Sequence, residues 1–189
     1  MTEHFEVTFK DANVVNSAKY KRAESVYDLL SSVVSAIIFV AIILVFFFRI
    51  ATVNGDSMVP TLTDHDRLLL TTASSVYNYG DIVVIHREGE EALVKRVIAT
   101  PGDTLNIDFE KGIVTVNDKV LNEPYIAEPT YLSFSDGPNF LFKVPSGYYF
   151  CMGDNRNNSL DSRSGAVGLI NEQYIIGKMV IDISDTEAK

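Results

Sequence analysis

The sequence contains a single cysteine, Cys151, which excludes an intramolecular disulfide without indicating whether the surrounding compartment is oxidising or reducing. Cys151 lies in the aromatic run of residues 148–152, and this run predicts a buried strand. A catalytic thiol needs polar neighbours that lower its pKa, so a structural role for Cys151 is favoured.

Basic residues are also few. The chain has 16 lysines and arginines against 25 aspartates and glutamates, and its formal net charge is −9. Phosphate backbones and anionic lipid headgroups repel such a chain unless it carries a local basic patch, and the sequence has none. Nucleic acid is therefore not expected as a partner. No cluster of histidine, cysteine and aspartate has the spacing of metal ligands, so neither a metal nor a cofactor is expected.

One segment, residues 29–48, is apolar over about twenty positions without a charge or a proline, the length at which an α-helix crosses a bilayer. A cleaved secretory signal has a basic start and a shorter apolar stretch of roughly 7–15 residues, whereas here a polar leader precedes a longer one. A buried core helix would show a polar stripe, and serines near one end of the segment do not form one. We therefore expect a retained transmembrane anchor.

The charges that flank this segment predict its orientation. Lys19, Lys21 and Arg22 precede it, and Arg49 alone follows immediately. Basic residues are retained on the cytoplasmic side, so we expect a single-pass protein with its N-terminus inside. The expected parts are a cytoplasmic tail at residues 1–28, an anchor at 29–48 and an extracytoplasmic domain at 49–189.

The rest of the chain reads as β structure. Short β-branched and aromatic runs alternate with turn signals, of which residues 101–103 (PGD) and 145–147 (PSG) are examples. The predicted strands are residues 67–72, 82–85, 92–99, 104–107, 113–116, 140–144, 148–152 and 175–183. We predict a mainly β fold, in which a single N-terminal transmembrane helix is followed by an antiparallel β-sheet domain. Residues 103–145 are looser and predict an inserted β subdomain.

Two of the polar segments in this domain surround residues that could be reactive. Residues 54–62 (NGDSMVPTL) place Ser57 between a flexible glycine and a rigid proline, although most such serines satisfy turn hydrogen bonds. In residues 93–98 (LVKRVI), Lys95 and Arg96 interrupt an apolar strand, and alternation sends their side chains to opposite faces. A solvated lysine on an edge strand is the alternative interpretation.

A third polar segment, residues 153–165 (GDNRNNSLDSRSG), directly follows the aromatic run that contains Cys151. Almost every residue in it carries a hydrogen-bonding group. This composition is typical either of a solvated loop or of a loop that displays functional groups on a rigid scaffold.

Together these segments resemble the signature motifs of the type I signal peptidases, a family of membrane-bound serine endopeptidases. The matching segments are GDSMVPTL at residues 55–62, GDIVV at 80–84, VKRVI with PGD at 94–98 and 101–103, and GDNRNNS with DSR at 153–159 and 161–163. The resemblance covers nearly the whole chain, and its short length and single span are similar to the Gram-positive branch. It implies an enzyme of the bacterial cytoplasmic membrane that removes N-terminal signal peptides from secreted preproteins, near the secretion translocon and without a cofactor.

The resemblance also implies a catalytic pair, with Ser57 as nucleophile and Lys95 as base. Lysine normally titrates near pKa ~10.4, so it acts as a base at neutral pH only where burial lowers its pKa by several units. Leu93 and Val97 lie on the same face of the predicted strand as the lysine and are expected to desolvate it. The histidines, for which no carboxylate arrangement defines a base, are His4, His65 and His86.

An unpaired carboxylate close to the lysine would raise its pKa, so Asp154 and Asp161 need partners of their own. The resemblance implies that Arg96 pairs with Asp154 and that Arg163 pairs with Asp161. It further implies that the hydroxyl of Ser159 orients the lysine amine.

The backbone N–H of Ser57 is expected to stabilise the oxyanion that forms during acylation. Some members of the family carry a hydroxyl residue two positions before the nucleophile, whereas Gly55 offers none here, so the second donor is left undefined. The implied substrates have small residues at the first and third positions before the cut. The residues expected to wall their pockets are Val53, Met58, Leu93 and Val94.

Two other functions are compatible with parts of the sequence. A self-cleaving Ser/Lys protease of the transcriptional-repressor kind shares the chemistry, but the anchor and the missing DNA-binding segment count against it. A membrane-tethered assembly factor without catalysis would be favoured by loss of Ser57 or Lys95, and both are present.

Overall fold

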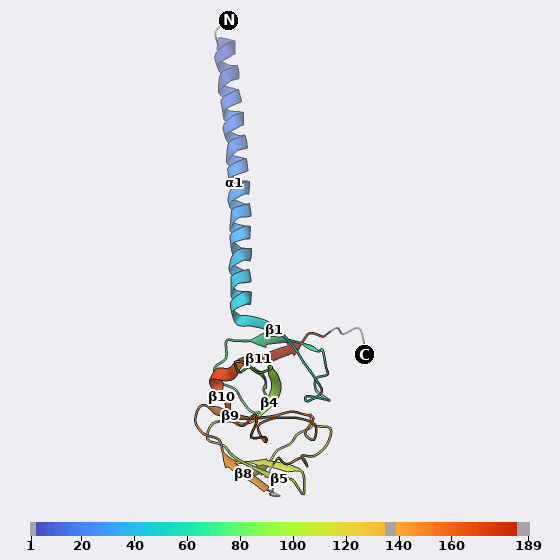
Figure 1. Cartoon of the computed structure of the whole chain (residues 1–189). Coiled ribbons are helices and arrows are strands. Elements are labelled where there is room, and N and C mark those ends of the chain that lie inside the picture. The colour runs from blue at the N-terminus through green and yellow to red at the C-terminus, as the bar shows by residue number, and fades with distance from the viewer. Residues whose placement is uncertain (1–2, 135–138, 185–189) are drawn as a thin grey trace. The chain divides into compact units, whose positions relative to one another are not determined.

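The computed structural model describes residues 3–134 and 139–184, which fall into two compact units, Met1–Phe46 and Phe47–Lys189. The first unit lies within the helix α1, Glu3–Phe47, which continues without a break over 45 residues (Figure 1). Its portion Ser25–Phe47 has a mean hydropathy of 2.9 and is exposed, and it is long and apolar enough to cross a membrane.

This helix differs from the predicted anchor at both ends. It begins at Glu3, because the polar leader contains neither the glycine nor the proline that would interrupt a helix. It ends at Phe47, one residue before the predicted end of the apolar segment. Phe48 instead starts the strand β1, Phe48–Thr52, which pairs with the next strand along the chain.

The second unit is built on a seven-stranded sheet in the order β1-β2-β11-β3-β4-β9-β10, with every pairing antiparallel. Its further strands are β2 Arg67–Thr71, β3 Ile82–Ile85, β4 Leu93–Ala99, β9 Tyr148–Met152, β10 Ile170–Asn171 and β11 Ile175–Asp182. A short 3-10 helix, Glu172–Tyr174, separates β10 from β11. β4 lies between β3 and β9, so both of its edges are hydrogen-bonded.

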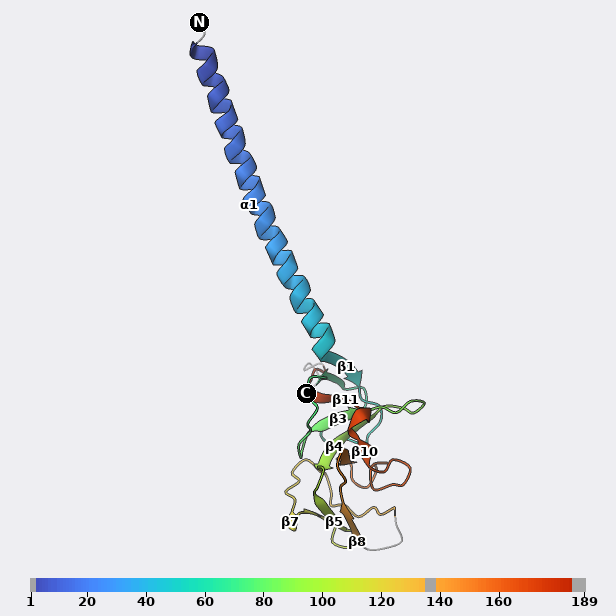
Figure 2. The same ribbon diagram turned by 90° about the vertical axis from the view of Figure 1, so that its left-hand side faces the viewer.

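A four-stranded sheet in the order β7-β6-β5-β8 is inserted between β4 and β9. Its strands are β5 Thr104–Asp108, β6 Ile113–Val116, β7 Lys119–Val120 and β8 Asn139–Lys143. Figures 1 and 2 show that this sheet lies at the end of the domain away from β1 and β11. The predictions of a mainly β domain and of an inserted β subdomain are confirmed.

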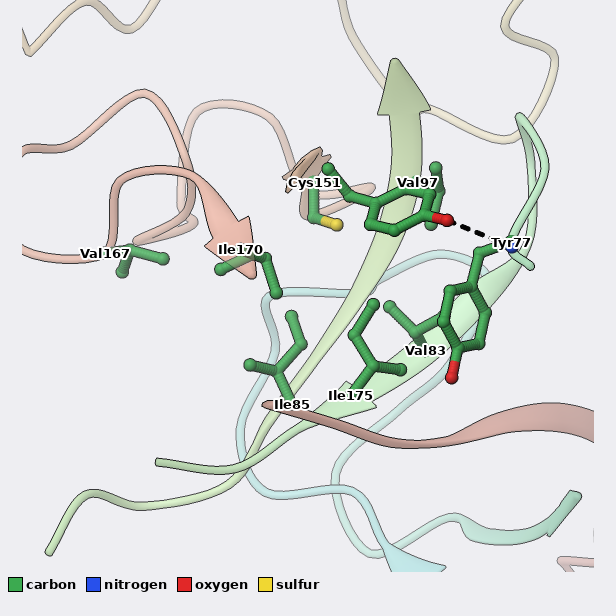
Figure 3. Close-up of a cluster of buried hydrophobic side chains, with 9 residues drawn as sticks. Tyr77, Val83, Ile85, Val97, Cys151, Val167, Ile170 and Ile175 are labelled. Atoms are coloured by element: carbon green, nitrogen blue, oxygen red, sulfur yellow. Dashed lines mark hydrogen bonds between the residues drawn. The ribbon is translucent and has the colours of Figure 1, made fainter. Parts of the chain in front are cut away.

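The buried side chains form three clusters on and between the sheets. The Val97 cluster, shown in Figure 3, contains Tyr77, Val83, Ile85, Val97, Tyr149, Cys151, Val167, Ile170 and Ile175. The Met58 cluster contains Val53, Met58, Leu62, Leu68, Leu70, Ile82, Val84 and Val94. The Phe150 cluster contains Ile98, Ala99, Leu105, Ile107, Phe109, Val114, Val144, Phe150 and Met152, and it joins the two sheets. β4 contributes to all three clusters, with Val94 in the Met58 cluster, Val97 in the Val97 cluster, and Ile98 and Ala99 in the Phe150 cluster.

Candidate active site

Ser57 lies in the loop between β1 and β2. Backbone hydrogen bonds from Val53 N to Asp66 O at 2.8 Å and from His65 N to Val53 O at 3.0 Å close the base of this loop. Gly55 has a φ of 83°, a conformation that glycine adopts without strain. The buried side chain of Met58 anchors the loop in the core, so the half-buried Ser57 is held by its neighbours on both sides.

Lys95 lies in the middle of β4, opposite Val83 of β3, and only 3% of it is exposed. Its Nζ donates to Ser57 Oγ at 2.7 Å and to the carbonyl of Val94 at 3.0 Å. The alternative of a solvated lysine on an edge strand is therefore excluded, because β4 has a partner strand on each side and the amine is buried.

Burial is the main cause that lowers the pKa of Lys95, because the charged ammonium loses its hydration inside the protein. The negative charges of Asp161 and Asp154 oppose this shift, and the positive charge of Arg163 adds to it. The net effect is a lowered pKa. Environment and geometry thus agree, since the amine is close to the hydroxyl and is shifted toward the neutral form that can accept a proton.

Arg96, the next residue of β4, forms a two-pronged ion pair with Asp154 on the loop after β9. Arg96 Nε donates to one carboxylate oxygen at 2.8 Å and Nη2 donates to the other at 2.5 Å. The Asp154 side chain is fully buried and that of Arg96 is 10% exposed. Arg96 Nη1 also donates to the carbonyl of Gly80 at 2.8 Å. The pair therefore joins β4 to the polar loop and satisfies the Asp154 carboxylate.

The second predicted pairing has the same form. Arg163 Nε and Nη2 each donate to Asp161 at 2.8 Å, and both side chains are fully buried. Asp161 also accepts from the backbone N–H of Gly153 at 3.0 Å and of Arg163 at 3.2 Å, while Arg163 Nη2 also donates to the carbonyl of Arg156 at 2.7 Å. These bonds fold the polar segment back on itself.

Ser159 is buried, and its hydroxyl has no hydrogen-bond partner among the described residues. The bonds from the Lys95 amine go to Ser57 and Val94, so the structure does not bond Ser159 to the lysine. Ser159 nevertheless lies at the site. A Cβ added to Gly153 would collide with both the Ser159 hydroxyl and the backbone carbonyl of Ser57.

Of the four residues expected to wall the substrate pockets, three are brought together and the fourth lies apart. Val53, Met58 and Val94 are buried in the Met58 cluster, whereas the half-buried Leu93 packs against the Val97 cluster. Neighbouring residues of a strand point to opposite faces, so Leu93 and Val94 cannot line the same pocket wall.

Comparison with known proteins identifies the family of this chain. The family model described as "Signal peptidase, peptidase S26" matches residues 26–183, a segment that includes the helix from its apolar part onward and every residue discussed above. The chain belongs to this signal peptidase family. Signal peptidase I U of Bacillus subtilis is 36% identical over 175 residues, with 88% of this chain and 91% of that protein covered. Signal peptidase I P of Bacillus subtilis subsp. natto is 37% identical over 169 residues, with 84% and 90% covered.

A solved structure of a signal peptidase I from Enterococcus faecalis is 26% identical. The match covers 54% of this chain and 95% of that one, with a TM-score of 0.43.

Among the described residues of this signal peptidase chain, Lys95 bonds to Ser57, and neither His65 nor His86 bonds to that pair. His65 is exposed and forms an ion pair with Asp64 at 3.1 Å, and His86 is exposed at the end of β3. The side chain of His4 lies outside the described residues.

Sequence reasoning missed the residues that surround the Arg96–Asp154 pair. Thr61, in the Ser57 loop, donates its hydroxyl to Asp154 at 2.5 Å. The ring centroid of Tyr125 lies 4.1 Å from the guanidinium carbon of Arg96. In the sequence, Thr61 follows the nucleophile motif and Tyr125 lies in the proline-rich part of the insertion, and neither position carries a local signal of this role.

Proposed function

We propose that this protein is a membrane-anchored endopeptidase that removes signal peptides from preproteins, with Ser57 as nucleophile and Lys95 as general base. The observation that carries the proposal is the 2.7 Å contact between Lys95 Nζ and Ser57 Oγ, made by a buried amine whose pKa is lowered. The similarity of the chain to signal peptidases I of Bacillus supports the same activity.

In the acylation step, the neutral amine of Lys95 accepts the proton of the Ser57 hydroxyl as Oγ attacks the scissile carbonyl carbon. The carbonyl oxygen becomes an oxyanion. When the C–N bond breaks, the ammonium of Lys95 gives its proton to the leaving amine, and the substrate remains as an ester on Ser57. A water molecule then loses a proton to Lys95 and hydrolyses the ester, which restores the serine.

The oxyanion needs a donor that is in place before the reaction. The backbone N–H of Ser57 makes no hydrogen bond within the described part of the chain, so it is available for this role. Gly55 supplies no side chain, and its N–H donates to Asp64 Oδ1 at 2.7 Å. Position 55 therefore offers no hydroxyl donor, and the donor that we assign to the oxyanion is the backbone N–H of Ser57.

Ser159, Arg96, Asp154, Asp161 and Arg163 support the base in this proposal. In the two ion pairs, the arginine charges offset part of the effect by which Asp154 and Asp161 raise the pKa of Lys95. The buried and unpartnered hydroxyl of Ser159 is available to the amine when it turns from Ser57 toward the leaving group.

The apolar part of α1 supports attachment to a bilayer, with the N-terminus inside and the protease domain outside the cytoplasmic membrane. The basic residues before the span support this orientation, because basic residues are retained on the cytoplasmic side. Preproteins held at the membrane by their own apolar segments share that surface with the enzyme, which raises the effective concentration of both. This arrangement favours a position near the translocon.

The proposal is tested by incubating the purified full chain, in detergent micelles, with a preprotein that carries a signal peptide. Cleavage at the end of the signal peptide is expected, and Ser57→Ala should abolish it while the fold is retained. Equal cleavage by the wild type and by Ser57→Ala would overturn the proposal.

A further inference from the structure

The segment of residues 122–130 leaves the inserted sheet after β7 and returns to the Arg96–Asp154 pair. We propose that Tyr125 in this segment is a positioning residue for the catalytic base, because its ring holds the guanidinium of Arg96 against Asp154. The inference rests on the proposed function, in which Lys95 is that base.

The ring of Tyr125 lies over the Arg96 guanidinium at a centroid distance of 4.1 Å, well within the range of a cation–π contact. A second guanidinium, that of Arg156, lies 5.9 Å from the same ring. Tyr125 is half-buried, and its ring covers one face of the Arg96 guanidinium. The fork of Arg96 is already engaged with Asp154 in the plane of the guanidinium, and the ring adds restraint perpendicular to that plane.

A second ion pair, between Arg156 and Glu123, holds Tyr125 in this position. The Tyr125 hydroxyl donates to Glu123 Oε1 at 3.0 Å and lies 3.1 Å from the hydroxyl of Tyr79. Glu123 in turn accepts from Arg156 Nη2 at 2.6 Å and from Nη1 at 3.0 Å. The Arg156 side chain is fully buried and also donates to the carbonyl of Gly153 at 3.1 Å. The segment is therefore fixed to the same polar loop that carries Asp154.

The segment also reaches the loop of the nucleophile. Thr61, which follows Ser57 in that loop, donates its hydroxyl to Asp154 Oδ2 at 2.5 Å and accepts from Arg96 Nη2 at 3.3 Å. The backbone carbonyl of Tyr125 lies 3.5 Å from the same hydroxyl. Tyr125 thus contacts both the Ser57 loop and the residue next to Lys95, and it joins the insertion to the two parts of the chain that carry the reacting groups.

Removing the ring should change the charge state of Lys95 in one direction. Asp154 raises the pKa of Lys95, and a loosely held Arg96 would offset that carboxylate less well. Water admitted where the ring was would hydrate the ammonium form, and burial is the largest cause of the lowered pKa. Both changes raise the pKa of Lys95, so less of the base is neutral at a given pH.

The test compares kcat/KM across neutral to alkaline pH for the full chain in detergent micelles, with a quenched fluorescent peptide that carries alanine at the first and third positions before the cut. In Tyr125→Leu the rising limb should move to higher pH. A shift of about one pH unit makes the variant about tenfold slower at pH values below the limb. At the alkaline plateau its rate should return toward that of the wild type.

Two variants serve as controls. Tyr125→Phe keeps the ring and loses only the hydroxyl contacts, so its limb should stay much nearer to that of the wild type than the limb of Tyr125→Leu does. Tyr131→Leu removes the exposed tyrosine that directly follows the segment of residues 122–130, and it should also leave the limb in place. If Tyr125→Leu does not fold, Tyr125→Met, which lacks a ring but keeps an apolar side chain, gives the same comparison.

The inference is overturned if the ring-less variant has the limb of the wild type, or if its rate is reduced equally at every pH, as expected for a residue that only supports the fold. Failure of the proposed function gives a different result, because cleavage would then persist in Lys95→Arg whatever residue occupies position 125.

Discussion

Lys95 Nζ and Ser57 Oγ lie within 2.7 Å of each other although their residues are 38 positions apart in the chain. Lys95 belongs to a strand that is paired on both edges, and Ser57 belongs to a loop closed by backbone hydrogen bonds at its base. Neither residue reaches the other through a flexible segment. The contact is therefore a property of the folded domain, and changes at either residue test the chemistry more directly than they test the fold.

Lys95→Arg should abolish cleavage while the fold is retained. The guanidinium stays protonated at any working pH and cannot accept the proton of Ser57. The loss should be at least about 10²-fold, the usual range for a general base. In the wild type, the rate should rise with pH at values below the ordinary lysine pKa of 10.5. The pH profile of peptide cleavage measures both effects, and a double change of His65 and His86 to alanine should leave the rise in place. Activity in Lys95→Arg would contradict the assignment of the base.

Lys95→Met should stabilise the domain at neutral pH. The folded-state pKa of Lys95 is lowered, so the unfolded chain binds this proton more readily than the folded chain does. The cost of the buried lysine is then greatest below the folded-state pKa and declines as pH rises toward 10.5. Melting temperatures of both proteins, measured at neutral and at alkaline pH, should differ most at neutral pH. A difference that grows with pH would contradict the direction of the shift.

Arg96→Ala should mainly lower stability. It leaves the fully buried carboxylate of Asp154 without its partner, and breaking one half of a buried ion pair costs about 3–5 kcal/mol. Denaturant unfolding measures the loss, and Lys111→Ala, which breaks the exposed pair with Asp108, is the control expected to change little. The folded fraction of Arg96→Ala should still cleave peptide at alkaline pH. Inactivity as complete as that of Lys95→Ala would show that the two side chains do not have separate roles.

Gly153→Ala should impair catalysis even where the domain still folds. The added Cβ would collide with Ser159 Oγ and with the carbonyl of Ser57, so the nucleophile loop must shift. A displacement of about 1 Å can reduce a rate by as much as 10²-fold. Gly165→Ala in the same segment is a matched control, because a Cβ there meets nothing within 4 Å. Equal rates for the two variants would mean that the close approach at Gly153 is not needed.

Protease added to intact spheroplasts should digest the domain that follows the span and leave the N-terminal part of α1 protected. The expectation follows from the three basic residues before the span and the single one immediately after it. Immunoblots with tags at each terminus report the two parts separately. Protection of the C-terminal tag until the cells are lysed would reverse the assigned orientation.

The strands were predictable because their signals are local. Short β-branched and aromatic runs bounded by turns located β3, β6 and β9 at the same residues as the structure. β1 was missed because Phe48 continues the apolar run of the helix, and only pairing with β2 makes it a strand. β7 and β10, at two residues each, are too short to show a period.

Strand alternation predicted that Lys95 and Arg96 point to opposite faces of β4. The same rule places Leu93 and Val94, both expected to wall the substrate pockets, on opposite faces of the strand. The position of Tyr125 was not predictable, because it depends on the return of the inserted segment to a strand that precedes it in the chain. Long-range packing of this kind leaves no periodic pattern in the sequence.

The Val97 cluster joins parts of the chain that are far apart in the sequence. It brings Tyr77, which precedes β3, together with Ile170 of β10 and Ile175 of β11. Leu93 and Val97, the neighbours of Lys95 on the same face of β4, lie against or within this cluster. We therefore expect the lysine to become fully desolvated only when the C-terminal strands have packed, and to be protonated beside an unreactive serine until then. A protease that remains inert until its own fold is complete does not attack the unfolded copies of itself that are being made around it.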